Sequence, residues 1–237
     1  MEPFDTLLRV QERDTAIDQL RHRRDALPER ASLAAVEAER TAVESQLVDV
    51  TARRDEAARA QSRLEDEVES MDSKAGEVER KLYSGSVSAP RELQAMQADV
   101  ESIKRHKSAV EDQLLELMER REPLDAEVAR LEAERARLDA AAAELVGAIV
   151  EAEVTIDVEL EDEQREREQL VAAAPDDLVA LYEELRVKLG GVGVAALVGD
   201  RCGGCHLKLP ATELARIKRE PPDAVLRCDQ CGRILVR

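Results

Sequence analysis

Apolar residues recur along most of the chain at alternating intervals of three and four, the spacing of a coiled-coil seam. One run of fifteen such positions begins at Leu33 and ends at Leu82, and twelve of them are apolar. A second run of nineteen positions extends from Leu93 to Ile156, and sixteen of them are apolar. Because a mean interval of 3.5 residues keeps one stripe of a helix facing a partner, the pattern predicts two long helices packed together.

A short segment without heptads, residues 83–90, separates the two runs. Gly85 can adopt the left-handed conformation that ends a helix, and Pro90 suits the first turn of the next one. About 80 residues lie on each side of this segment, so each arm would be roughly 120 Å long at ~1.5 Å per residue. Two equal arms joined by a short turn favour an antiparallel hairpin within one chain. A parallel homodimer would need an unbroken helix through Gly85 and Pro90.

Prolines and charged residues interrupt the apolar pattern at a few places. Upstream of Leu33 the spacing is less regular, and Pro28 indicates a kink or a register shift. Pro123 lies inside the second run without changing its phase, so we expect a bent, continuous helix. Five basic residues occupy seam positions, where we expect them to reach solvent or to pair with acids on the facing arm: Arg40, Arg54, Lys107, Arg121 and Arg135.

The heptads end after Leu170, and a different pattern begins. A short helix is expected from Pro175 to Leu189, ended by Gly190 and Gly191. Residues 192–198 indicate a strand or an extended linker. The other expected elements are strands around Leu207 and Leu209, at Val225 and Leu226 and at residues 234–236, and a short helix at residues 212–219.

All four cysteines lie near the C-terminal end as two CxxC pairs separated by 22 residues, Cys202 with Cys205 and Cys228 with Cys231. A CxxC turn directs two sulfurs at one point, and four thiolates complete a tetrahedral Zn²⁺ site with no open position. In a reducing compartment such pairs favour metal over disulfide. We therefore expect one structural Zn²⁺ per chain. Its binding free energy, ~10–16 kcal/mol for such sites, would let this short segment fold around a small core.

Other interpretations of the cysteines are weighed against zinc. Residues 202–206 read CxxCH, the attachment pattern of haem c, but the second CxxC already completes a metal tetrad. A thioredoxin-like redox pair would need a βαβ pattern, which surrounds neither motif. A zinc site that releases its metal on oxidation is a further alternative. His206 is expected to be a surface residue beside the site and not a ligand.

Composition narrows the class of protein. Charged residues make up 37% of the 237-residue chain and aromatic residues 1%, with no Trp. This mixture is typical of long helices and coiled coils, and it supplies few aromatic side chains to line an enzyme's pocket. The sequence contains no P-loop, GxSxG or HExxH motif. We therefore expect a non-enzymatic, mainly α-helical protein with a small β-rich zinc ribbon.

Charge is distributed unevenly along the chain. The formal net charge is −17, whereas residues 200–237 carry eight Lys or Arg and five Asp or Glu, a net of +3. Contact with an anionic partner is therefore expected on this C-terminal module, although it has no aromatic residues for base stacking. No apolar run approaches the ~20 residues needed to cross a bilayer, and residues 1–10 lack an apolar signal core. A cytoplasmic protein without membrane contact is expected.

Two regions of the chain, the hairpin tip and the tail, resemble a known family. The hairpin tip reads LYSGSVSAPRELQ at residues 82–94, and the tail reads CGGCHLKLP at residues 202–210 and RCDQCGRIL at residues 227–235. Together they resemble the bacterial coiled-coil proteins with a C-terminal four-cysteine zinc ribbon, across nearly the whole chain. Better-known members are non-enzymatic partners of the transcription apparatus. Some are tied to the sigma-54 factor and flagellar gene control, and RNA binding has been suggested. The resemblance implies a regulatory adaptor.

These observations lead to two expected domains. Residues 1–172 would form the antiparallel coiled-coil hairpin, with its tip at about 83–90, and residues 173–237 a short helix and the zinc ribbon, with a metal core at 200–237. The leading hypothesis is an adaptor that binds a protein partner, such as the transcription machinery or a sigma factor. Nucleic-acid binding, a redox-sensing zinc site and a structural spacer are alternatives, and monomer and homodimer both stay open. Candidate contacts are Tyr83, Gly85, Arg216, Lys218, Arg219 and Arg233.

Overall fold

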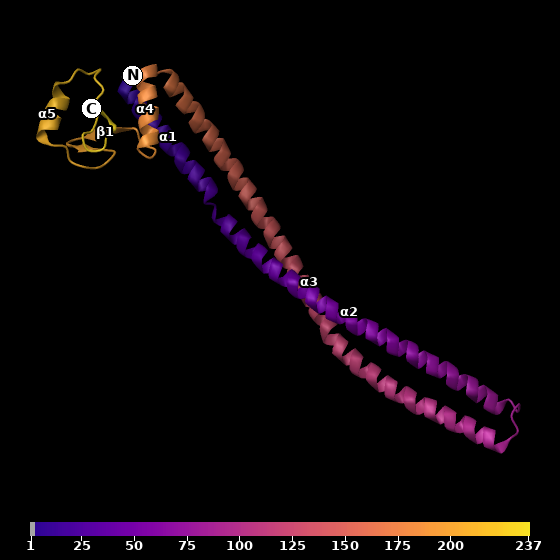
Figure 1. The fold of residues 1–237 in the computed structure, drawn as a ribbon. Helices are drawn as coiled ribbons and strands as arrows, with labels where there is room; N and C mark the ends of the chain where they lie inside the picture. The colour runs from indigo at the N-terminus through magenta and orange to yellow at the C-terminus, as the bar shows by residue number, and fades with distance from the viewer. Residues whose placement is uncertain (1–2) are drawn as a thin grey trace. The chain divides into compact units, whose positions relative to one another are not determined.

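The computed structural model describes residues 3–237, so Met1 and Glu2, at the start of the first expected domain, lie outside the described part. The architecture is a helical hairpin followed by a small sheet with four cysteines, which confirms the predicted fold class (Figure 1). In chain order the elements are α1 (Pro3–Asp25), α2 (Pro28–Tyr83), α3 (Pro90–Ala172), α4 (Asp176–Lys188), β1 (Val194–Val198), β2 (Arg201–Cys202), α5 (Ala211–Arg219) and β3 (Ile234–Val236).

Contacts between residues divide the chain into two compact units. The arm unit comprises residues 32–144, and the ribbon unit comprises the described residues up to 31 together with residues 145–237. This division differs from the boundary at residue 172 that the sequence indicated, because α1 and the end of α3 pack with α4 and the sheet into one core. No helix within residues 3–237 combines the length and the apolar character needed to cross a membrane.

In the arm unit, α2 and α3 run antiparallel. Arg40 of α2 pairs with Asp139 of α3 at 3.6 Å, and nearer the turn Lys107 of α3 pairs with Asp72 of α2 at 2.6 Å. In the second pair both residues are nearer to the turn in the sequence than those of the first pair. The two helices therefore run in opposite directions. Pro123 lies within an uninterrupted α3, as predicted. The buried apolar residues of this unit lie on the predicted seams: Ala75, Val100, Val110, Val128, Leu131, Leu138 and Ala142.

The other basic seam residues contact the facing helix or reach solvent. Arg54 lies 3.8 Å from Asp125 of the facing helix. The guanidinium of Arg121 donates a hydrogen bond of 2.8 Å to the side-chain oxygen of Gln61 on the facing helix. Arg135 is exposed to solvent. Arg54 and Arg121 therefore add polar, register-specific contacts beside an apolar seam.

The ribbon unit is built around a core that joins its helices to its sheet. Helix α1 ends at Asp25 and α2 begins at Pro28, where the sequence predicted a kink or register shift. The core residues come from α1, the end of α3, α4, β1 and β3: Leu7, Val10, Leu170, Leu178, Tyr182, Leu185, Val194, Ile234 and Val236. Because these side chains interdigitate in one cluster, the ribbon is packed against helices and is not a freely tethered module.

The sheet has the strand order β2-β1-β3. Strand β1 pairs antiparallel with β2 and parallel with β3, with Val194 opposite Ile234. The strands expected around Leu207 and at Val225–Leu226 shrink to isolated bridges, at Lys208 and at Arg227. Pairing at both positions is short: the Leu209 amide donates to the Asp200 carbonyl at 2.9 Å, and the Leu226 carbonyl accepts from the Leu235 amide at 2.9 Å.

Candidate metal centre

Four thiol sulfurs converge at the candidate metal centre. The Cys202 and Cys231 sulfurs are 3.9 Å apart, the Cys205 and Cys228 sulfurs are 4.0 Å apart, and all four lie within 4.8 Å of one another. Tetrahedral Zn²⁺ with Zn–S bonds of ~2.3 Å requires sulfur–sulfur distances of about 3.8 Å. The four cysteines therefore have the spacing to hold one zinc ion, and four thiolates would leave it no open position for a substrate.

Two turns with the same backbone hydrogen bonds supply these sulfurs; we call residues 202–207 the first knuckle and residues 228–233 the second knuckle. In each, the amide of the first cysteine donates to the carbonyl five residues on, Leu207 or Arg233. In each, the carbonyl of that cysteine accepts from the amide four residues on, at 2.8 Å. The repeated pattern explains how two CxxC sequences place their sulfurs alike.

The two knuckles differ at the residue that follows the second cysteine. Both positions adopt the left-handed conformation, with φ of +60° at His206 and +74° at Gly232. Glycine adopts this conformation without strain, whereas a side chain disfavours it. His206 is exposed. Its place in the knuckle is therefore that of a backbone turn residue on the surface.

The environment of the thiols separates their pKa values. Burial raises the pKa of Cys228 to about 12, and burial also raises the pKa of Cys202. Burial acts in the same direction on Cys231, but hydrogen bonds from the backbone and guanidinium of Arg233 outweigh it and lower that pKa to about 7. Zinc binds thiolates and releases their protons. The hydrogen bonds of Arg233 therefore favour the thiolate form of Cys231, which is the form that zinc binds.

Helix α5 is fastened to the second knuckle by polar contacts that the sequence did not reveal. The backbone amide of Asp229 donates to a carboxylate oxygen of Glu213 at 3.0 Å, and Glu213 is buried. Arg216 of the same helix pairs with the Asp229 carboxylate at 3.2 Å. Arg237 donates to the carbonyls of Ile217 and Pro221, at 2.8 and 2.7 Å. An acidic residue facing a knuckle amide therefore positions α5 beside the metal centre.

The candidate contact residues of the ribbon lie at two different places, three of them on α5 and one in the second knuckle. Arg216, Lys218 and Arg219 lie together on α5, and all three are exposed. Arg233 is held elsewhere: its guanidinium donates to the carbonyls of Val192 and Leu189, at 3.0 and 3.3 Å. Arg233 therefore ties the second knuckle to the link between α4 and β1.

Tyr83 and Gly85 lie at the turn between α2 and α3, in the arm unit. Gly85 has a φ of +73°, the left-handed conformation expected there. The Ser84 hydroxyl donates to the Lys81 carbonyl at 2.8 Å and accepts from the Ser86 amide at 3.2 Å. The side chain of Tyr83 is 81% exposed. The turn thus has a defined backbone and presents an aromatic ring to solvent.

A buried glutamine fastens the ribbon to α1. The side-chain amide of Gln11 donates to the Gly191 carbonyl at 3.0 Å, and its oxygen accepts from the Gly193 amide at 2.8 Å. Gln11 therefore bonds the link between α4 and β1 as a neighbouring strand would. Gly193 permits the close approach, because a Cβ there would lie 2.8 Å from the Tyr182 carbonyl oxygen.

A buried acid completes this attachment. Asp14 of α1 accepts from the Tyr182 hydroxyl at 2.6 Å and from the Arg167 guanidinium at 2.7 Å. Only 5% of its side chain is exposed. A sequence signal existed, because Asp14 follows Leu7 and Val10 at the seam spacing and occupies a position where an apolar residue is expected.

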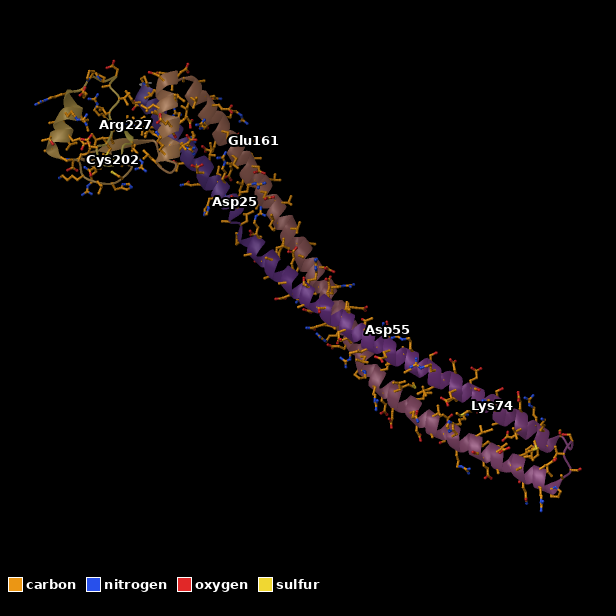
Figure 2. The ribbon with its side chains drawn as sticks, in the orientation of Figure 1. Asp25, Asp55, Lys74, Glu161, Cys202 and Arg227 are labelled. Carbon is orange, nitrogen blue, oxygen red and sulfur yellow. The ribbon has the colours of Figure 1, made fainter. Side chains whose placement is uncertain are left out.

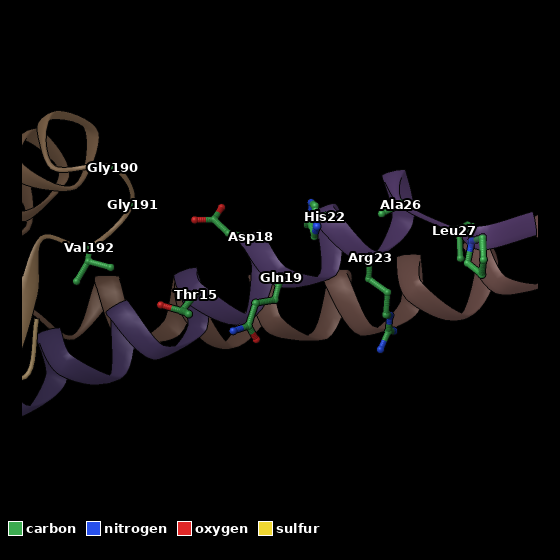
Figure 3. Close-up of a pocket in the computed structure, with 11 residues that line it drawn as sticks. Thr15, Asp18, Gln19, His22, Arg23, Ala26, Leu27, Gly190, Gly191 and Val192 are labelled. Carbon is green, nitrogen blue, oxygen red and sulfur yellow. The ribbon is translucent and has the colours of Figure 1, made fainter. Parts of the chain in front are cut away.

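An open groove of about 700 Å³ lies between α1 and the link that Gln11 holds (Figure 3). Its lining includes Asp18, His22 and Leu27 of the α1–α2 region, and Gly191 and Val192 of the link. The Asp18 carboxylate is engaged by the Arg186 guanidinium at 2.6 Å. The lining residues contain no nucleophile set beside a base, so the groove has no recognisable catalytic arrangement.

Similar proteins share both parts of this chain. An uncharacterized protein of Mycobacterium tuberculosis strain H37Rv is 34% identical over 98% of this chain and 94% of its own length. An uncharacterized protein of Mycobacterium leprae is 30% identical over 93% of this chain and 94% of its own length. A solved structure from Mycobacterium smegmatis matches with a TM-score of 0.86 and 29% identity, over the full length of both chains.

More distant likeness concerns the fold alone. CT398 from Chlamydia trachomatis matches with a TM-score of 0.67 and 18% identity, over 98% of this chain and 96% of its own.

Two family models match this chain. The C4-type zinc ribbon domain matches residues 201–235, which include the four cysteines. The CT398-like coiled coil hairpin domain matches residues 10–190, most of the chain. The protein therefore belongs to the CT398-like family of coiled-coil hairpin proteins and carries a C4-type zinc ribbon at its C-terminal end.

Proposed function

We propose that the protein is a non-enzymatic cytoplasmic adaptor whose zinc ribbon and α4 bind a protein partner. One structural zinc ion per chain would hold the two knuckles together, and residues 200–237 depend on it because their own apolar core is small. The family resemblance supports a role in transcription or gene regulation, with a sigma factor or another part of the transcription machinery as the partner.

Exposed apolar side chains on α4 and on residues 194–237 carry this proposal. Val187, Val198, Leu207 and Val225 are each between 47% and 80% exposed. Val198 and Leu207 stand on either side of the cysteine pair of the first knuckle, and Val225 precedes the second. Removing such side chains from water is favourable by about 25 cal/mol per Å², so a surface that combines them with charged residues suits a protein partner.

The state of the ribbon's cations supports a protein partner over nucleic acid. Arg233 and Arg237 donate to backbone carbonyls within the ribbon unit. Lys208 pairs with Asp200 at 2.6 Å, and Arg216 pairs with Asp229. Half of the eight basic residues of this module are therefore engaged internally, which reduces the charge available for phosphate contacts.

The adaptor proposal is tested by affinity capture with three zinc-loaded proteins. These are the wild type, a Val198→Asp and Leu207→Asp double variant, and a Val48→Asp control, whose exposed valine lies in the arm unit. The expected result is one protein retained by the wild type and by the control and lost from the double variant. Metal analysis of each preparation establishes that the ribbon is intact. Identical eluates from all three proteins would refute the proposal.

Nucleic-acid binding is the second candidate, because Lys218 and Arg219 are exposed on α5 and no ion pair engages them among residues 3–237. It predicts that affinity for RNA or DNA falls steeply with salt concentration. Exchanging both residues for Glu would abolish that binding. Binding that is absent, or that persists in the charge-reversed variant, would remove this candidate.

A further inference from the structure

Helix α3 carries an apolar stripe that faces solvent within the ribbon unit. The stripe consists of Val146, Val150, Val154 and Val158, each between 47% and 60% exposed. A spacing of four residues places them along one ridge, roughly 18 Å long at ~1.5 Å per residue. The seam residues Ile149 and Ile156 of the same segment are buried. The valines therefore form a second apolar surface, beside a seam that is already satisfied.

The charge around this stripe is of one sign. Residues 145–164 contain no Lys or Arg, and their seven acidic residues are Glu151, Glu153, Asp157, Glu159, Glu161, Asp162 and Glu163. Such a segment repels other anionic surfaces and attracts cationic ones. The composition alone would be an ordinary solvated helix face, but here it surrounds exposed valines.

Arginines of α1 and α2 neutralise one side of this segment. Arg24 pairs with Asp157 at 2.9 Å, Arg23 with Glu159 at 2.6 Å, and Arg13 with Glu163 at 3.0 Å. Arg30 pairs with Glu153 at 2.5 Å. The helices that pack on the seam of this part of α3 therefore present apolar residues with arginines beside them.

Two acids beside the stripe have no such partner. Glu151 and Glu161 are exposed, and neither forms an ion pair with any residue in the described range 3–237 (Glu161 is labelled in Figure 2). Glu151 lies three residues before Val154, and Glu161 three residues after Val158, so each adjoins the stripe on the helix surface. The stripe therefore resembles the buried seam of α3 in having apolar residues beside acidic ones. Unlike the seam, it has no arginine-bearing helix packed against it within residues 3–237.

We propose that the valine stripe of α3 binds a basic amphipathic helix of a protein partner. Charge complementarity favours this occupant, because cations on such a helix would pair with Glu151 and Glu161 while its apolar face covers the valines. A second copy of the stripe would bring like charges together, and an anionic membrane would be repelled for the same reason. The stripe lies on α3, outside α4 and outside residues 194–237, so this proposal stands or falls independently of the function proposed above.

The test uses a fluorescent helical peptide of about 18 residues with leucines at i, i+3, i+4 and i+7 and arginines on both sides of that face. Its binding to the full, zinc-loaded chain is measured by anisotropy, with a scrambled peptide of the same composition as the reference. Val150→Ser with Val154→Ser should weaken binding about tenfold or more, because their burial is lost. Val48→Ser changes a valine of the arm unit that is 72% exposed, and it should leave the affinity unchanged.

Charge is tested separately with Glu151→Gln and Glu161→Gln. This pair should weaken the complex at low salt and flatten its salt dependence. Circular dichroism of each variant checks that the helices are intact. The proposal fails if the double valine variant binds as the wild type does, or if the scrambled peptide binds equally well. It also fails if light scattering shows a dimer that the valine substitutions dissociate, since the stripe would then bind a second copy.

Discussion

The ribbon unit and the arm unit use similar residues in different physical settings. In the ribbon unit, the ion pair of Arg167 with Asp14 has side chains that are 23% and 5% exposed. In the arm unit, the pair of Arg40 with Asp139 has side chains that are 38% and 51% exposed. A buried carboxylate that loses its partners keeps its desolvation cost, whereas an exposed one returns to water. Similar pairs therefore matter very differently in the two units.

Removal of the metal should have the largest effect, and should break the ribbon while sparing the arm. Cys228→Ser, or chelation of the wild type, is expected to remove ~10 kcal/mol or more of binding free energy, so residues 194–237 lose their order. Hydrogen exchange should then be fast in this segment and unchanged at residues 36–140. Ribbon amides that stay protected without metal would contradict the prediction. A separate treatment of the wild type with peroxide tests the redox-sensing alternative. Zinc release that a reductant reverses would support that alternative.

Deletion of a carboxylate should be the next largest effect. Asp14→Ala is expected to destabilise the protein by about 3–5 kcal/mol, because it leaves the Arg167 guanidinium and the Tyr182 hydroxyl without their shared acceptor. Asp139→Ala is the matched control and should cost no more than about 1 kcal/mol. Urea unfolding followed by circular dichroism measures both. Equal losses for the two variants would show that the buried network has no special weight.

Glycine-to-alanine exchanges should give smaller effects of opposite sign. Gly193→Ala places a methyl group 2.8 Å from the Tyr182 carbonyl oxygen, and overpacking of this kind costs about 1–3 kcal/mol. At Gly76, within α2, nothing lies within 4 Å of the added carbon. Since alanine is the better helix former, Gly76→Ala should stabilise the arm by ~0.5–1 kcal/mol. Thermal midpoints of both variants that move in the same direction would contradict this comparison.

The features that sequence could predict are the ones encoded by short-range spacing. The seams of α2 and α3 follow from intervals of three and four, and the turn between them from Gly85 and Pro90. The cysteine tetrad follows from two CxxC pairs, because local turn geometry already aligns each pair. Each of these predictions needs only residues that are near one another in the chain.

The features that sequence missed depend on contacts between distant residues. Asp14 meets Tyr182 across 168 positions, and Gln11 meets Gly193 across 182. A polar residue at a seam position indicates a buried polar contact. Its partner, however, lies on another element whose placement the heptads do not determine. Glu213 was missed for a similar reason, because its acceptor role depends on how α5 folds back onto the second knuckle.

The hydrogen bonds of Gln11 have a consequence for proteolysis. Residues 190–193 read Gly-Gly-Val-Gly, a stretch that a protease would be expected to cleave as a flexible linker. A protease must draw several residues into an extended conformation in its active site, and here the Gly191 carbonyl and the Gly193 amide are both bonded to one side chain. The exposed residues 84–86 are held by the hydrogen bonds of Ser84 to Lys81 and Ser86, which lie within the turn itself and bring in no side chain from another element. Limited digestion should therefore nick the hairpin turn first and leave the ribbon joined to α4.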